Sequence, residues 1–114
     1  MSKLSDKVGF LLKELFPNVR IKEEHYVVYD GHKLFVDFYI PSYLIAVEVH
    51  GRQHDEFVKH FHVDENGWRS HRLRDRRKEE WADVNNITYV VIRERNMPSS
   101  RQELLDLIRS CQRV

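Results

Sequence analysis

The sequence has one cysteine, Cys111, few glycines and prolines, and no apolar run long enough to cross a membrane. A single cysteine excludes an internal disulfide framework and a cysteine-based zinc site. No basic segment followed by an apolar stretch opens the chain, so we expect no secretion signal, no membrane partner and a cytoplasmic location. The low content of glycine and proline also excludes fibrous and low-complexity proteins.

Charge of one sign is not in excess either. The 114 residues include 19 lysines and arginines against 18 aspartates and glutamates, so only the local distribution of charge is informative about partners. Hydrophobic residues make up 41% of the chain and aromatic residues 11%, which is typical of a folded soluble protein. This length and composition predict one domain over residues 1–114 with a single hydrophobic core.

Local patterns predict short helices and strands in the order αβββαβα. Ser5 is positioned to cap a first helix that ends at Pro17, and Asp30-Gly31 is a strong signal for a β-hairpin. The expected elements are helices over 5–16, 68–85 and from Ser100-x-x-Glu103 onward, and strands over 21–29, 34–40, 44–50 and 87–92. Residues 52–67 have no clear period and are predicted to form an irregular loop. Together these elements predict an α/β domain of the α+β kind, in which a mixed central sheet is flanked by helices.

Two acidic residues, Asp37 and Glu48, lie inside apolar strands. If Ile40 pairs with Ile45 across the turn between the strands, the same antiparallel register places Asp37 opposite Glu48. Like charges opposed at about 5 Å destabilise a sheet, and a bound divalent cation offsets that repulsion. The acids therefore predict a Mg²⁺ site, with Mn²⁺ as a substitute, that serves phosphodiester hydrolysis. Period-two alternation places on one face Val36, Phe38, Ile40, Val47 and Val49, and on the other Asp37, Glu48 and His50.

A structural interpretation of the two acids stays open beside this one. In it, Glu48 protrudes into solvent from a half-exposed sheet, and Asp37 pairs with a nearby arginine such as Arg93. Neither a metal site nor catalysis would follow from that arrangement. The residues that come directly after Glu48 favour the catalytic interpretation.

Side chains with catalytic chemistry gather after the second acid. Three of them, which can orient water or donate a hydrogen bond to phosphate, are His50, Gln53 and His54. Two more histidines follow, His60 and His62, and a zinc site made of histidines is a second possibility, although the spacing is irregular. The metal that the oxygen ligands favour is Mg²⁺.

The predicted helix over 68–85 is dense in basic residues. Its narrow apolar stripe consists of Leu73, Trp81 and Val84. One interpretation is a solvated helix whose own glutamates balance the charge. The other is a grip on the DNA backbone, in which Lys78 or an arginine also approaches the acids and stabilises charge on the reacting phosphate. The residues assigned to DNA binding are Arg52, Arg69, Arg72, Arg74, Arg76, Arg77 and Lys78.

Three segments of the chain share a pattern with one group of enzymes. They are Val-Asp-Phe-Tyr-Ile-Pro at 36–41, Ala-Val-Glu-Val-His-Gly-Arg-Gln-His at 46–54, and Arg74-Asp75 with Lys78 before the last strand. With these segments the chain resembles the PD-(D/E)XK nucleases, in the branch of the very-short-patch repair endonuclease and small phage or homing-type endonucleases. The resemblance covers about residues 5–95. It implies a restriction-endonuclease-like fold in a bacterial or phage-infected cell, with Asp37, Glu48 and the Val49 carbonyl as Mg²⁺ ligands and with Gln53 and His54 near the scissile phosphate.

The chain departs from that pattern at two positions. The lysine that the superfamily carries two residues after the second acid is His50 here, which can act as a base, a weak ligand or a phosphate donor. The branch also takes a glutamate from the first helix, for which Glu14 is the candidate. The predicted function is a metal-dependent DNA endonuclease without a small-molecule cofactor, in which a homodimer or a partner protein supplies any high sequence specificity. Alternatives are a catalytically inactive nucleic-acid-binding module and a protein-interaction domain.

Overall fold

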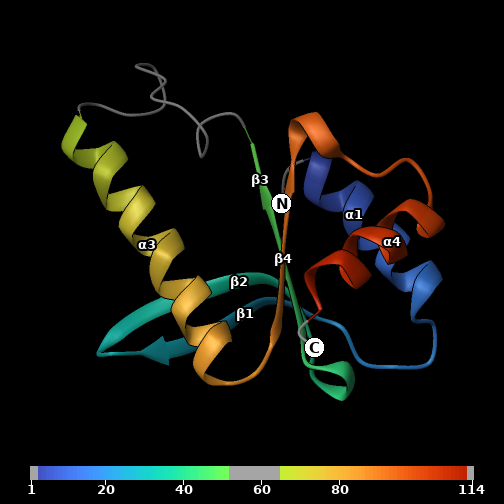
Figure 1. The fold of residues 1–114 in the computed structure, drawn as a ribbon, viewed down its shortest axis with the longest axis horizontal. Coiled ribbons are helices and arrows are strands. Elements are labelled where there is room, and N and C mark those ends of the chain that lie inside the picture. The colour runs from blue at the N-terminus through green and yellow to red at the C-terminus, as the bar shows by residue number, and fades with distance from the viewer. Residues whose placement is uncertain (1–2, 52–64, 113–114) are drawn as a thin grey trace.

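The structure is a computed structural model, and it describes residues 3–51 and 65–112 (Figure 1). Its elements follow the predicted order αβββαβα. The helices are α1 (Lys3–Leu15), α3 (Glu65–Val84) and α4 (Arg101–Cys111), and the strands are β1 (Lys22–Tyr29), β2 (His32–Ile40), β3 (Ile45–His50) and β4 (Thr88–Arg93). Two 3₁₀ turns, η1 (Pro41–Tyr43) and η2 (Glu94–Asn96), follow β2 and β4. No helix in these described ranges is long and apolar enough to cross a membrane.

The four strands form one mixed sheet in the order β1-β2-β3-β4. β1, β2 and β3 are antiparallel neighbours, whereas β4 runs parallel to β3. β3 is buried at every residue, as its apolar composition predicts for a central strand. α1 and α4 cover one face of the sheet, and α3 covers the other (Figure 1). The described residues therefore form a single α+β domain with a mixed sheet between two helical layers, which confirms that part of the prediction.

Short connections set the register of the sheet. Asp30 and Gly31 have positive φ values of 49° and 75°, as in a two-residue type I′ turn, and they join β1 to β2. Between β2 and β3, Ile40 pairs with Ile45. The register that brings the two acids together is thus the predicted one.

On either side of Asp37, two β2 residues that are two positions apart pack on opposite faces of the sheet. Phe38 packs against α1 and α4, whereas Val36, two residues earlier, packs with Ala46 under α3. The prediction that Val36 shares a face with Phe38 is therefore wrong. The β1–β2 register has no pair at Glu24 and Asp37, and Glu24 has a φ of 47°, so the regular pleat that the prediction assumed is interrupted there.

The two helix caps that the sequence predicts have different outcomes. α1 already begins at Lys3, so Ser5 lies inside the helix, where it is buried, and it is not the cap. Ser100 does cap α4, because its side-chain oxygen accepts a hydrogen bond from Glu103 N at 3.2 Å. The cap of α4 is confirmed because its signal includes a partner three residues later, whereas the signal at α1 was one serine.

α3 packs through a face that the apolar pattern does not describe. Trp81 is buried against the sheet, but Leu73 and Val84 are 46% and 67% exposed. The predicted stripe is wrong at these two positions because the inward face of the helix also carries charged side chains, with Lys78 buried and Asp75 half-buried. α3 also begins earlier than predicted, at Glu65, so the end of the expected loop is helical. The rest of that loop lies outside the described residues.

Candidate active site

Asp37 on β2 and Glu48 on β3 meet one position beyond the end of the β2–β3 ladder. The last ladder pair is Phe38 with Val47. Past this pair, Asp37 N donates to Glu48 Oε2 at 3.0 Å, and Val49 N donates to Asp37 Oδ2 at 2.8 Å. A backbone N–H group of one strand thus positions the carboxylate of the other. The prediction that the two acids are cross-strand neighbours is confirmed.

Glu48 is buried to a degree that is rare for a carboxylate. Only 1% of the residue is exposed, whereas Asp37 is half-buried. Burial raises the pKa of the Glu48 carboxyl to about 8, the Lys78 ammonium opposes this rise, and the charge of Asp37 adds to it. The alternative in which Glu48 points to solvent is therefore wrong, whereas the pairing of Asp37 with a nearby arginine such as Arg93 stays untested.

Lys78 on α3 forms an ion pair with the buried acid. Its Nζ lies 2.5 Å from Glu48 Oε1, and 9% of the residue is exposed. Taking two charges out of water is costly, and the pKa of Glu48 stays raised to about 8 although Lys78 lies beside it. Of the two roles that the sequence allows for Lys78, the position beside the acids is the one that the structure shows.

The acids, with Lys78, line a pocket of about 460 Å³. Val49 lines it too, and its N–H points to Asp37. Because the N–H and C=O groups of one strand residue face the same neighbouring strand, the Val49 carbonyl is directed to the same side. The other residues that line the pocket are Lys33, Phe35, His50 and Arg74.

The oxygen atoms at this pocket fit a hard divalent cation. Two carboxylates line the pocket, and Mg²⁺ usually binds one or two carboxylates and keeps several waters. Residues 3–51 and 65–112 hold no cluster of three or more His, Cys, Asp or Glu side chains that could bind a metal. The alternative zinc site depends on His54, His60 and His62, which lie outside the described residues.

His50 is buried at the end of β3, with 4% of the residue exposed. Its Nε2 atom lies 3.9 Å from Asp75 Oδ1 on α3. His50 lines the pocket of the acids and also a second pocket between α3 and β4. His50 therefore lies on the α3 side of the sheet and, as predicted, lines one pocket with Asp37 and Glu48.

The basic residues of α3 divide between two pockets. Arg74 lines the pocket of the acids, whereas Arg72 and Arg76 line the second pocket. Arg69 is exposed and lies in a groove with Arg72 and Arg76, and Arg77 is half-buried. The remaining predicted site residues, Arg52, Gln53 and His54, lie outside the described residues.

Glu14 is not brought to this site. It is exposed on α1 and lines a groove with the residues that precede and begin α4. α1 covers the face of the sheet opposite to α3, so the sheet separates Glu14 from the two acids. Within residues 3–51 and 65–112, the carboxylates that line this pocket are those of Asp37 and Glu48.

Residues of β4 that sequence reasoning did not assign to the site border the second pocket, which His50 also lines. The parallel register sets Tyr89 beside Ala46 and Arg93 beside His50. These residues alternate along β4, and the sequence signal that could have identified them is the period-two series Tyr89, Val91 and Arg93.

Comparisons with known proteins leave the family of the chain open. No family model matches it, and no solved structure matches it. A segment of 59 residues is 34% identical to "Uncharacterized protein 307L" of Invertebrate iridescent virus 6. That segment spans 52% of this chain and 30% of the viral protein, so the chain matches less than a third of that relative.

Glu48 gives the metal-free protein a pH dependence of stability. Its carboxyl pKa is about 8 in the folded state against 4.5 when exposed, so between these values the folded state keeps a proton that the unfolded state loses. The stabilising contribution is complete below the lower value and is lost as the pH rises through the higher one. Urea unfolding in EDTA should therefore show a free energy of unfolding lower by a few kcal/mol at pH 8 than at pH 5.

The variant Glu48→Gln isolates this contribution. The amide does not titrate but still offers an oxygen to Asp37 N, so the difference between pH 5 and pH 8 should shrink relative to the wild type. An unchanged difference in this variant would show that the pH dependence comes from other groups, and the assigned pKa shift would be wrong.

Proposed function

We propose that the protein is a metal-dependent DNA endonuclease with a restriction-endonuclease-like arrangement of the PD-(D/E)XK kind. The observation that carries the proposal is the pairing of Asp37 and Glu48 at the point where the β2–β3 ladder ends. Two ionised carboxylates at such a short distance repel each other, and a bound divalent cation removes this repulsion. The basic side chains around the same pocket, Lys33 and Arg74, match a polyanionic substrate.

Asp37, Glu48 and the Val49 carbonyl are the groups that would hold Mg²⁺, with Mn²⁺ as a substitute. When bound, the ion polarises the phosphoryl oxygen and makes a water molecule more acidic. Backbone N–H groups of the opposite strand fix one oxygen of each carboxylate, so the protein orients its ligands before a cation arrives.

Three other side chains have roles that follow from their positions. Lys78 balances the charge of buried Glu48 and presents a cation toward charge that develops on the reacting phosphate. His50, whose Nε2 lies 3.9 Å from Asp75 Oδ1, can orient a water molecule or donate a hydrogen bond to a phosphate oxygen. Arg74 lines the same pocket from the exposed side of α3 and can bind a phosphate oxygen.

A second candidate is a nucleic-acid-binding module that has this fold and does not cleave. The observation that favours it is the ion pair between Lys78 and Glu48, which already neutralises one of the two carboxylates without a metal. In this case the basic residues around the pocket would bind the DNA backbone and the acids would be structural.

Supercoiled plasmid distinguishes the two candidates. An endonuclease is expected to convert it to the open-circular or linear form in Mg²⁺ and to stop when excess EDTA is added. A binding module is expected to retard the plasmid in a native gel and to leave it supercoiled at every Mg²⁺ concentration. If the plasmid is neither cut nor retarded, both candidates are wrong. The variant Asp37→Asn, purified in the same way, controls for contaminating nucleases.

A further inference from the structure

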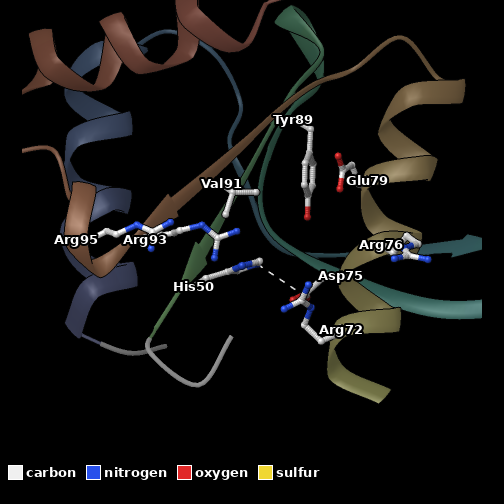
Figure 2. Close-up of a pocket in the computed structure, with 9 residues that line it drawn as sticks. All are labelled: His50, Arg72, Asp75, Arg76, Glu79, Tyr89, Val91, Arg93 and Arg95. Carbon is white, nitrogen blue, oxygen red and sulfur yellow. Dashed lines mark ion pairs between the residues drawn. The ribbon is translucent and has the colours of Figure 1, made fainter. Parts of the chain in front are cut away.

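A second pocket lies directly beside the pocket of the acids, and His50 lines both. It has a volume of about 360 Å³ and lies between α3, β4 and η2 (Figure 2). The charged residues that line it are four arginines, Arg72, Arg76, Arg93 and Arg95, and two acids, Asp75 and Glu79. Positive charge is therefore in excess in a concave site, where it acts more strongly than on a flat surface.

The arginines come from two opposite walls. Figure 2 shows Arg72 and Arg76 on α3 and, across the pocket, Arg93 and Arg95 at the end of β4 and in η2. The second wall is well defined, because Arg93 N donates to Asn96 Oδ1 at 2.7 Å and this bond closes the η2 turn. Guanidinium groups facing each other across a gap can bind the same anion from both sides, and arginine binds phosphate through two hydrogen bonds at once.

A buried hydroxyl lies between the two walls. Tyr89 is directed into the space beside His50 and Asp75 (Figure 2), and its Oη atom has no hydrogen-bond partner among the described residues. Burial, followed by the charges of Glu48 and other nearby carboxylates, raises the pKa of Tyr89, so the hydroxyl stays a donor at any ordinary pH. A buried donor without an acceptor is destabilising. The position therefore fits a ligand that supplies an acceptor oxygen.

We propose that this second pocket binds a phosphate group of the same DNA strand whose neighbouring phosphate occupies the pocket of the acids. The inference rests on the proposed function, because it takes the occupant of the first pocket to be DNA. Arg93 is the register partner of His50, so the second pocket begins where the first one ends. Phosphate oxygens would accept hydrogen bonds from the arginines of both walls and from Tyr89. The phosphate can be an internal phosphodiester or the terminal phosphate of the strand.

Binding of short oligonucleotides in EDTA tests this proposal without any catalysis. The probes are fluorescein-labelled single-stranded decanucleotides of one sequence, with and without a 5′-phosphate, followed by fluorescence anisotropy at several salt concentrations. The test variant is Arg93→Gln with Arg95→Gln. The matched control is Arg101→Gln with Arg109→Gln, which removes two charges from α4 on the opposite face of the sheet. Circular dichroism verifies that each variant is folded.

The test variant should bind at least about tenfold more weakly than the wild type, and its salt dependence should be lower by about one phosphate contact or more. The control should bind within about twofold of the wild type. An equal loss with both probes identifies an internal phosphodiester as the ligand. A loss seen only with the phosphorylated probe identifies a terminal phosphate. Wild-type affinity for both probes, or a loss no larger than that of the control, would overturn the proposal.

Two further measurements keep the result unambiguous. If the double variant does not fold, the single variants Arg95→Gln and Tyr89→Phe replace it, because the first changes an exposed side chain and the second removes one hydroxyl. Wild-type affinity in both single variants would overturn the proposal. Plasmid cleavage is measured in parallel. Weaker binding by the variant in a protein that never cleaves would refute the endonuclease and leave the phosphate pocket in place. Cleavage together with unchanged binding would refute the pocket alone.

Discussion

Replacing Asp37 with asparagine is expected to lower the rate of plasmid nicking by about 10²- to 10³-fold, because an amide oxygen without charge is a poor cation ligand. The amide can still accept the hydrogen bond from Val49 N, so the fold and the binding of plasmid in EDTA should stay within about twofold of the wild type. Initial nicking rates at saturating Mg²⁺ and plasmid binding in EDTA, both measured on the same protein preparation, test this expectation.

Asp106→Asn is the matched control, because it makes the same change at an exposed acid on α4, away from the pocket. It should nick at the wild-type rate. Wild-type nicking by Asp37→Asn would show that Asp37 is not a ligand. An equal loss of nicking and of binding would show that the residue supports the fold rather than the reaction.

Replacing Lys78 with methionine is expected to lower the free energy of unfolding by about 1–2 kcal/mol at pH 9, because Glu48 would then lose its cation and take up a proton above its pKa. At pH 5 the loss should be much smaller, since Glu48, with a pKa of about 8, is already protonated there. Urea unfolding in EDTA at the two pH values measures both quantities.

The double variant Lys78→Met with Glu48→Gln should recover most of the loss at pH 9, because neither charge is then buried. Lys13→Met, at an exposed lysine of α1, is the control and should change the free energy of unfolding by less than about 0.5 kcal/mol. Equal losses at pH 5 and pH 9, or strictly additive effects in the double variant, would contradict the assigned ion pair.

The proximity of the two acids could be predicted from the sequence because short-range signals decide it. The four residues between Ile40 and Ile45 form a tight connection, and this connection determines the strand register as far as Asp37 and Glu48. The face of Val36 could not be predicted in the same way. The pleat is interrupted where Glu24 in the neighbouring strand has a positive φ, and a glutamate gives no sequence signal for that conformation.

The partners of the acids were harder to predict, because they come from elements that are distant in the sequence. Lys78 points toward the sheet, although a lysine in a basic helix is normally exposed. The apolar pattern of α3 predicts instead that Leu73 and Val84 point toward the sheet, and both are exposed. Packing against a polar site reverses that rule for one face of the helix. The position of Tyr89 could not be predicted either, because only the parallel pairing of β4 with β3 sets it beside Ala46, two residues before Glu48.

Anomalous diffraction from a crystal soaked in MnCl₂ is the most direct test of the central idea, that two strand acids share one cation. The account predicts a manganese peak within about 2.2 Å of one oxygen each of Asp37, Glu48 and the Val49 carbonyl, and no such peak in crystals of Asp37→Asn. Manganese bound elsewhere, or an empty pocket in crystals of a protein that cleaves DNA in Mn²⁺, would contradict it.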